Sequence, residues 1–443
     1  MKYLYRVLSV LLVLAFFVGA CAPKPVGAPA VEKPAENVTL RVATWLDAEG
    51  SAKFDVVAKA FEASHPGVTI KHEAVAGSGA AIYPDVLRTS IAAGDPPDVF
   101  YMWGGSIAGQ YIDAGQVLPL NASYEKYQWD DRFSAALIER LSRDGKTYGV
   151  PISNLGMGFW YKKSTMELIG IDSQEKLPKT FAEMEEMCGK FKEQGLYCVS
   201  IGGKFGWHTM RITDYLLEAK CGPEKHDALN TLKESWDQAC VVEAYDTFQQ
   251  WIDKGWIVPD FLTTSPDDSR LPIFDGSAAL VNEGIWWEGV LRDNEMPSDQ
   301  FDFFVPPTDH SPLRFSAFYE QIMIPSNAKN QDRAAEFIDW YSSKATIEMN
   351  EESKALIGGF PANKDVKPDC ATRPLTCKWI DTLATAEGTY PPTDQAFYKE
   401  LMDSFFEIQD KVVAGQLTPQ EAAKLFQERA AAWKAANPDK VSK

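Results

Sequence analysis

From Val38 onward the chain alternates short apolar patterns typical of strands with longer amphipathic patterns typical of helices. Alternate apolar positions predict a strand over Val38–Thr44. Ser51 is expected to cap the next helix, whose buried stripe recurs at i, i+3, i+4 and i+7, namely at Phe54, Val57, Ala58 and Phe61. This alternation predicts an α/β architecture with parallel sheets. About 400 residues of such sequence are long enough for two domains with separate cores.

The same pattern continues to the end of the chain. Further strands are predicted over residues 68–75, 97–101, 156–161 and 196–201, and a turn followed by an apolar run over 274–282. Helices are predicted over residues 83–93, 180–193 and 332–342. Thr418-Pro419-Gln420-Glu421 is a capping box with proline at the first helical position, which predicts a terminal helix that reaches about Ala436.

The first 20 residues have the features of a secretory signal peptide. Lys2 and Arg6 precede an apolar run over residues 7–18, which is too short to span about 30 Å of hydrocarbon comfortably. The sequence Val18-Gly19-Ala20-Cys21 resembles a bacterial lipobox, which implies lipidation of Cys21; the alternative is an ordinary signal peptide with an incidental cysteine. Residues 22–37 are rich in Ala and Pro and are expected to be a flexible linker. We therefore expect an exported protein that a lipid anchors to the outer face of the cell membrane.

Charge narrows the class of partner. The formal net charge of the chain is −18. Binding to nucleic acid requires clustered Lys and Arg, so the charge argues against nucleic acid and against a polyanionic ligand. Because the acidic residues are spread along the chain, their simplest role is solubility.

The seven cysteines fit an oxidising compartment. Without Cys21 six remain, and they form neighbouring couples in the sequence. We predict the disulfides Cys188–Cys198, Cys221–Cys240 and Cys370–Cys377, each worth on the order of 2–3 kcal/mol in the chain-entropy model. A metal site is the rival interpretation, but the chain has no C-x-x-C and its five histidines are scattered. We therefore expect no metal and no cofactor.

Several segments together resemble the extracellular solute-binding proteins of ATP-driven sugar importers, the family of maltodextrin-binding and multiple-sugar-binding lipoproteins. The longest are IAAGDPPDVFYMW (91–103), DGKTYGVPISNLGMGFWYKK (144–163) and FDGSAALVNEGIWW (274–287). The others, in family order with these, are residues 38–45, 61–70, 114–120, 177–186, 334–341, 358–362 and 415–423, and each match taken alone is loose. Their order and number carry the resemblance over nearly the whole mature chain.

The resemblance implies a two-lobed periplasmic-binding-protein-like fold of type II, with crossovers near Pro151, Arg314 and Phe360. Lobe 1 would comprise residues 38–150 and 315–359, and lobe 2 residues 151–314 and 360–443. A carbohydrate would bind between the lobes, which close around hinges. The implied partners are the permease subunits of an ABC transporter and their cytoplasmic ATPase. The chain is expected to be a monomer without enzymatic activity.

Aromatic residues suggest where a sugar would bind, because sugar rings present flat C–H faces edged by hydroxyl groups. The chain has 13 Trp, and several follow predicted strands, where open α/β sheets bind ligands. The residues singled out on this ground are Trp45, Asp47, Glu49, Trp103, Trp207, Trp286 and Trp287. The resemblance supports Trp103 and Trp286 and adds Asn154, Tyr319, Glu320 and Phe360. In this chain Asn282-Glu283-Gly284 stands where the family has Asn-Gly. The residue that matches the family's aromatic position is therefore Trp286 or a residue about one position away.

Two other classes of function remain as alternatives. A lipid-anchored glycosidase would need paired carboxylates, but acidic residues are so common here that any pair is uninformative. The chain has no G-x-S-x-G and no H-E-x-x-H, and Arg140 stands where a P-loop ending at Gly145-Lys146-Thr147 would need its first glycine. The second alternative keeps the fold and changes the ligand to a polyamine, a peptide or an osmolyte. A sensor that presents its ligand to a receptor has the same sequence features as an importer component.

Overall fold

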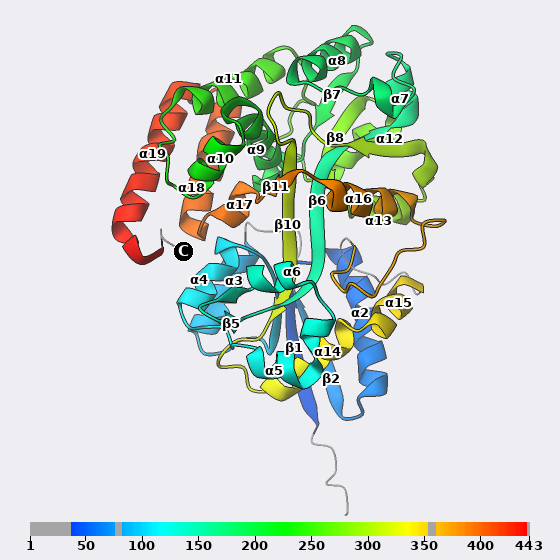
Figure 1. Cartoon of the computed structure of the whole chain (residues 1–443), viewed down its shortest axis with the longest axis vertical. Helices are drawn as coiled ribbons and strands as arrows, with labels where there is room; N and C mark the ends of the chain where they lie inside the picture. The colour runs from blue at the N-terminus through cyan, green and yellow to red at the C-terminus, as the bar shows by residue number, and fades with distance from the viewer. Residues whose placement is uncertain (1–36, 76–81, 353–359, 441–443) are drawn as a thin grey trace, which may run out of the picture. The chain divides into compact units, whose positions relative to one another are not determined.

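The computed structural model describes residues 37–75, 82–352 and 360–440, and the described residues from Thr39 onward form one structural unit (Figure 1). The predicted signal peptide, the lipidation site Cys21 and the linker up to residue 36 lie outside the described residues and stay predictions. Within the described ranges, no helix has both the length and the apolar character needed to cross a membrane.

In the described residues, nine strands form one mixed sheet. Its main order is β2 (Val68–Ala74), β1 (Val38–Thr44), β3 (Val99–Trp103), β10 (Arg314–Met323), β6 (Val150–Lys162), β8 (Ala278–Gly284) and β7 (Tyr197–Ser200). The short strands β11 (Gly388–Tyr390) and β9 (Phe301–Phe304) pair with β10 and β6. A separate hairpin joins β4 (Ser142–Arg143) to β5 (Lys146–Thr147).

The two long strands β6 and β10 lie side by side in the middle of the sheet. They are antiparallel, with Phe318 opposite Leu155 and Tyr319 opposite Asn154. Figure 1 shows them running between the helices α2, α5 and α14 at one end and α7, α8 and α11 at the other. The prediction of parallel sheets is therefore correct for β1–β3 and β7–β8 and wrong for the centre. At the centre, β6 and β10 run antiparallel to each other, β6 runs antiparallel to β8, and β10 runs antiparallel to β3.

Helices cover both ends of the sheet. Around β1, β2 and β3 lie α2 (Ala48–Ser64), α3 (Tyr83–Ala92), α4 (Ser106–Asp113), α5 (Asn121–Tyr127), α6 (Ala135–Arg140), α14 (Gln331–Tyr341) and α15 (Lys344–Glu352) (Figure 1). Around β7 and β8 lie α7 (Lys163–Glu167), α8 (Phe181–Glu193), α9 (Trp207–Cys221), α10 (Pro223–Asn230), α11 (Ala239–Asp253), α12 (Leu271–Asp275) and α13 (Trp287–Asp293) (Figure 1). The remaining helices are α16 (Pro374–Thr385), α17 (Thr393–Ala396), α18 (Lys399–Val413) and α19 (Pro419–Ala436).

The buried faces and most N-terminal caps of the predicted helices match the sequence patterns. The buried residues of α2 are the four of the predicted stripe. Its start differs, because Asp47 and not Ser51 is the N-cap: the Asp47 carboxylate accepts a hydrogen bond from the backbone N–H of Gly50 at 2.7 Å. The helices α8 and α19 both begin with a complete capping box, at Thr180 and at Thr418.

Three disulfides join elements that are close in sequence. Cys188–Cys198 connects α8 to β7, Cys221–Cys240 connects the end of α9 to the start of α11, and Cys370–Cys377 lies at α16. The predicted pairing is therefore confirmed. Each bridge closes a short loop, which restricts the unfolded chain more than the folded one.

Candidate functional site

A cavity of about 550 Å3 lies between segments that are far apart in the sequence, from Trp45 to Asp394. This volume falls in the range of about 300–1,000 Å3 that is usual for small-molecule sites. Six aromatic side chains line it: Trp45, Trp103, Phe205, Trp207, Trp286 and Phe318. Six acidic side chains (Asp47, Glu49, Asp267, Asp293, Glu320, Asp394) and six basic ones (Lys53, Lys204, Arg211, Arg270, Arg292, Arg373) also line it. The wall is thus aromatic and, in formal charge, balanced.

One side of the cavity is a stacked tryptophan pair. The rings of Trp45 and Trp103 lie 4.1 Å apart at an interplanar angle of 26°. Trp45 follows β1 and Trp103 ends β3, and these strands are parallel neighbours with Val42 opposite Val99. The carboxyl ends of parallel strands meet at one edge of a sheet, which brings both indoles to the same place.

A second aromatic group of the wall forms where Trp286 follows β8. Its ring packs edge-on against Phe318 at 6.2 Å. The indole N–H of Trp286 donates to Glu283 Oε2 at 2.7 Å, and Arg270 Nε donates to the other oxygen of the same buried carboxylate at 2.9 Å. Gly284 is needed here, because a Cβ at this position would lie 2.1 Å from the Trp286 ring. Glu283 and Gly284 therefore fix the orientation of this indole.

The Trp207 ring stacks on the buried ring of His208, with the ring centroids 5.0 Å apart and an interplanar angle of 19°. The backbone N–H of Gly202 donates to His208 Nδ1 at 3.0 Å, so Nε2 carries the proton and donates to the carbonyl of Asn282 at 2.9 Å. Burial lowers the pKa of His208 to about 4, so the ring is neutral at physiological pH. His208 is therefore a support for Trp207.

Many charged groups in the wall neutralise one another. Lys53 Nζ lies 2.5 Å from Asp293 Oδ2, which joins α2 to α13, and Arg270 Nη1 lies 2.6 Å from Asp267 Oδ1. Glu320 has no ion-pair partner among the described residues; Ser153 Oγ donates to it at 2.7 Å. Burial raises the pKa of Glu320 to about 7. Such a wall suits a neutral polar ligand better than one with several charges.

Seven of the eleven residues predicted to contact a ligand line the cavity: Trp45, Asp47, Glu49, Trp103, Trp207, Trp286 and Glu320. The other four are outside its lining: Asn154, Trp287, Tyr319 and Phe360. As ligand contacts, all eleven stay predictions.

The alternation of side chains along a strand explains why two of these four residues, Tyr319 and Asn154, do not line the cavity. Phe318 and Glu320 lie two residues apart on β10 and both line the cavity, so Tyr319 between them points to the opposite face, where its hydroxyl donates to the carbonyl of Arg140 at 2.7 Å. Asn154 is opposite Tyr319 in the ladder and is exposed, whereas Leu155, opposite Phe318, lines the cavity.

The remaining two pack in the interior. Trp287 is fully buried in a cluster with Trp160 and Trp379, because α13 begins there and turns the side chain away from Trp286. Phe360 is partly buried against the same cluster.

The sequence analysis did not single out several side chains of the wall, above all Arg211, Arg270, Phe318 and Asp394. Phe318 could have been found from Glu320 by applying the two-residue period of a strand. Arg211 and Asp394 are single polar residues on helices, and no local pattern distinguishes them from surface charges.

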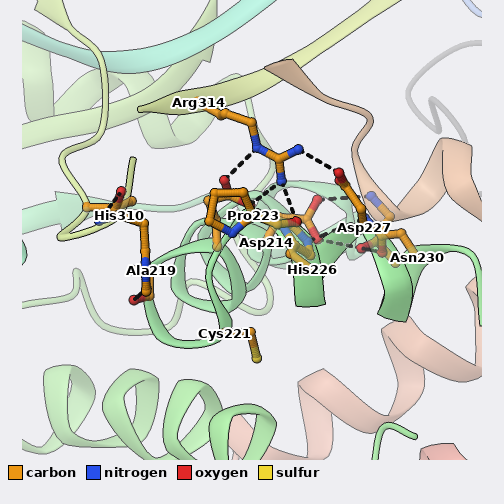
Figure 2. A network of polar contacts seen from close by, with 12 residues as sticks. Asp214, Ala219, Cys221, Pro223, His226, Asp227, Asn230, His310 and Arg314 are labelled. Carbon is orange, nitrogen blue, oxygen red and sulfur yellow. Dashed lines mark hydrogen bonds and ion pairs between the residues drawn. The ribbon is translucent and has the colours of Figure 1, made fainter. Parts of the chain in front are cut away.

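A polar network outside the cavity lining connects α9 and α10 to β10 (Figure 2). Arg314, the first residue of β10, donates from Nε and Nη2 to the two oxygens of Glu218 at 2.8 and 2.9 Å. Its Nη1 donates to Asp227 at 2.7 Å, and His226 contacts Glu218 at 2.7 Å. In Figure 2 the Arg314 side chain reaches down to the end of α9 and to α10. The network ties these two helices to the strand that carries Phe318 and Glu320.

Within the described ranges, no group of three or more His, Cys, Asp or Glu side chains is placed to hold a metal ion.

A family model described as bacterial extracellular solute-binding protein matches residues 46–348. An uncharacterized ABC transporter extracellular-binding protein of Pyrococcus horikoshii is 23% identical over 95% of this chain and 89% of its own length. The xylose/arabinose-binding protein XacG of Haloferax volcanii is 24% identical over 79% of this chain and 74% of its own length.

Among solved structures, a chitin oligosaccharide binding protein superposes with a TM-score of 0.81 at 23% identity and covers 90% of this chain and 99% of its own. This likeness confirms the predicted two-lobed α/β fold.

Proposed function

Since the chain belongs to the family of bacterial extracellular solute-binding proteins, we propose that it captures a carbohydrate in the cavity and delivers it to the permease of an ABC importer. The relatives of this family are binding proteins, and the chain has the same fold. The observation that carries the proposal is the cavity wall, which combines six aromatic side chains with equal numbers of acidic and basic ones.

The chemistry of that wall fits a sugar. The aromatic groups Trp45 with Trp103 and Trp286 with Phe318 offer flat faces to the C–H groups of a ring. Between them stand carboxylates and guanidinium groups, which accept from and donate to hydroxyl groups. Polyamines need a surplus of acidic groups, and the equal number of acids and bases here does not favour them. The names of the relatives, which include xylose, arabinose and chitin oligosaccharide, support the same class.

The capture would involve two lobes. We place lobe 1 at residues 38–150 and 315–359, and lobe 2 at residues 151–314 and 360–443. In this division Trp45, Trp103 and Phe318 belong to lobe 1, and Trp207 and Trp286 to lobe 2, so closure would bring aromatic side chains of both lobes onto the ligand. Residues 1–20 would be removed as a signal peptide, and Cys21 would carry the lipid that anchors the protein outside the cell membrane.

A thermal-shift screen tests the ligand class. A ligand that binds only the folded state raises the melting temperature by mass action. We expect a shift with at least one of D-xylose, L-arabinose, D-galactose, maltose, chitobiose and raffinose, and none with spermidine, glycine betaine or a tripeptide. A shift with a non-sugar alone would leave the fold intact and refute the carbohydrate proposal.

Trp286→Ala tests the site. If the indole stacks on a sugar, its removal should weaken binding by about 2 kcal/mol or more, as for other buried aromatic anchors. The matched control is Trp433→Ala, which removes a partly buried indole that packs on Tyr398 outside the cavity. Equal sugar affinities of the two variants would remove Trp286 from the site.

Cys21→Ser tests the anchor separately. The substitution removes the only residue that the lipobox would lipidate, so the protein should move from the membrane fraction to the soluble fraction. Continued sedimentation with membranes would contradict the anchor without affecting the sugar proposal.

A further inference from the structure

One buried part of the cavity wall is the Arg211 corner, which consists of Arg211, Phe318 and Asp394. Arg211 and Asp394 are each 5% exposed. The guanidinium lies over the Phe318 ring, 4.9 Å from its centroid, and Arg211 Nη2 is 3.8 Å from Asp394 Oδ2. A cation, an anion and an aromatic face therefore converge on one place.

The two charged groups of this corner are poorly paired. An arginine and a carboxylate that are free to approach form hydrogen bonds of about 2.7–2.9 Å. The 3.8 Å separation is too long for one, and the hydrogen bond of Arg211 to Ser316 Oγ is long at 3.4 Å. In the described part of the chain, Arg211 Nε and Asp394 Oδ1 have no hydrogen-bond partner. Unpaired buried polar groups are costly, typically about 1–3 kcal/mol each.

The same helix shows that close pairing is possible. Two turns further along α9, Glu218 accepts from Arg314 at 2.8 and 2.9 Å. Glu218 therefore forms a close pair with its arginine, whereas Asp394 stays 3.8 Å from Arg211. We infer that the wide separation at the Arg211 corner is specific to that position.

The gap is held open by contacts behind it. Asp214, one turn after Arg211 on α9, accepts from the backbone N–H of Thr393 at 3.0 Å and from its hydroxyl at 2.5 Å. Thr393 directly precedes Asp394, and Asn230 contacts the same hydroxyl at 3.3 Å. These bonds fix the start of α17 against α9, so Asp394 does not close onto Arg211. Figure 2 shows Asp214 and Asn230 among the side chains of this network.

We propose that the Arg211 corner is the subsite that recognises a neutral hydroxyl-bearing ring of the ligand and rejects carboxylated and amino sugars at that ring. This inference rests on the proposed function and adds the substrate class to it. One hydroxyl accepts from the Arg211 guanidinium and donates to the Asp394 carboxylate, which satisfies both groups at once. A ligand carboxylate would satisfy Arg211 but would face Asp394, and a ligand ammonium would satisfy Asp394 but would face Arg211. Phe318 supplies the apolar face beside the hydroxyl.

The test compares neutral and charged sugars on the purified protein by titration calorimetry. The probes are D-galactose, D-galacturonate and D-galactosamine, the three corresponding glucose compounds, and the dimers cellobiose, digalacturonate and glucosamine dimer. The wild-type protein should bind at least one neutral member at least about 100-fold more tightly than its charged counterparts, because a charged group would leave one member of the pair unsatisfied. A charged sugar that binds as tightly as its neutral counterpart would overturn the inference.

Two variants test the residues. Asp394→Asn should weaken binding of the neutral sugar about 10-fold or more and reduce the rejection of the carboxylated one. Arg211→Gln should weaken the neutral sugar similarly and reduce the rejection of the amino sugar. The control Glu407→Gln removes a carboxylate that is paired with Arg429 outside the cavity, and it should leave both ratios unchanged. Unchanged ratios in Asp394→Asn and Arg211→Gln would refute the assignment.

If either variant fails to fold, the subsite can be tested on the wild-type protein alone. The affinity of the bound sugar is then compared with the affinities of its deoxy analogues, monodeoxygalactoses or monodeoxyglucoses. Loss of the recognised hydroxyl should cost about 100-fold or more in affinity, and analogues that all bind within threefold of the parent would refute the subsite. Failure of every sugar to bind the wild-type protein would be a different result, because it refutes the proposed function and this inference falls with it.

Discussion

Glu320 should make the ligand-free protein less stable as the pH rises, and Glu320→Gln should remove this effect. The side chain lies in the cavity wall on β10, opposite Trp103 and Ser153 in the sheet. Burial raises the pKa of Glu320 from its ordinary value of 4.5 to about 7, and hydrogen bonds from Ser153, at 2.7 Å, and from the Trp103 side chain offset only part of this effect. The carboxyl is therefore easier to ionise in the unfolded chain than in the folded one.

The sign and the size follow from linkage. Between pH 4.5 and about pH 7 the folded state keeps a proton that the unfolded state loses, so the free energy of unfolding falls as the pH rises. One pKa unit corresponds to about 1.36 kcal/mol, so the shift of Glu320 accounts for up to about 3 kcal/mol, lost in full by pH 8. Glutamine does not titrate, and it can still accept the hydrogen bond of Ser153.

Denaturant unfolding of the wild-type protein and Glu320→Gln from pH 4.5 to pH 8 measures the difference. The variant should gain stability relative to wild type as the pH rises, by up to about 3 kcal/mol at pH 8. Other groups with raised pKa, such as Asp394 and Asp410, are present in both proteins and cancel in the difference. The control is Glu407→Gln: hydrogen bonds from Arg429 and Lys411 lower the pKa of Glu407 to about 2, so its difference from wild type should be flat over pH 5–8. Parallel stability curves for wild type and Glu320→Gln would refute the reasoning.

Two further predictions concern stability. Replacing Cys221 and Cys240 by alanine should lower the free energy of unfolding by about 3 kcal/mol, the chain-entropy value for a loop with a sequence separation of 19; an unchanged denaturation midpoint would contradict it. Lys53→Met and Asp293→Asn, combined in a double-mutant cycle of unfolding free energies, should show a coupling of about 1 kcal/mol, because their 2.5 Å ion pair joins α2 to α13 in a half-buried position. Strictly additive effects would show that the pair does not couple these helices.

Local patterns predicted the helices and strands because local physics determines them. The stripe of α2 and the capping boxes at Thr180 and Thr418 depend only on residues within a few positions of each other. The start of α2 was missed because Asp47 and Ser51 are both good N-cap residues, and the sequence does not say which one the chain uses.

The site was predicted only in part because its geometry depends on strand pairing. The side chains at the ends of β1 and β3 could be placed together, since parallel strands share an edge. Tyr319 and Glu320 were both predicted to contact a ligand although neighbours on a strand point to opposite faces, and only the ladder shows that Glu320 faces the cavity. Arg211 and Asp394 meet across 183 positions of sequence, a contact that no local pattern contains.

The polar network around Arg314 gives a reason why Arg211 on α9 meets Phe318 on β10 with a definite geometry. The helix α9 carries Arg211 in its first half, and its second half is tied through Glu218 to Arg314. Arg314 begins the strand on which Phe318 and Glu320 follow at the same face, four and six residues later. A displacement of α9 relative to β10 would therefore break a buried, bidentate ion pair before it moved Arg211 away from Phe318, and breaking such a pair costs about 3–5 kcal/mol when one partner is lost. The polar network outside the cavity thus sets the positions of the polar groups inside it, which is the condition for selecting one pattern of hydroxyl groups over another.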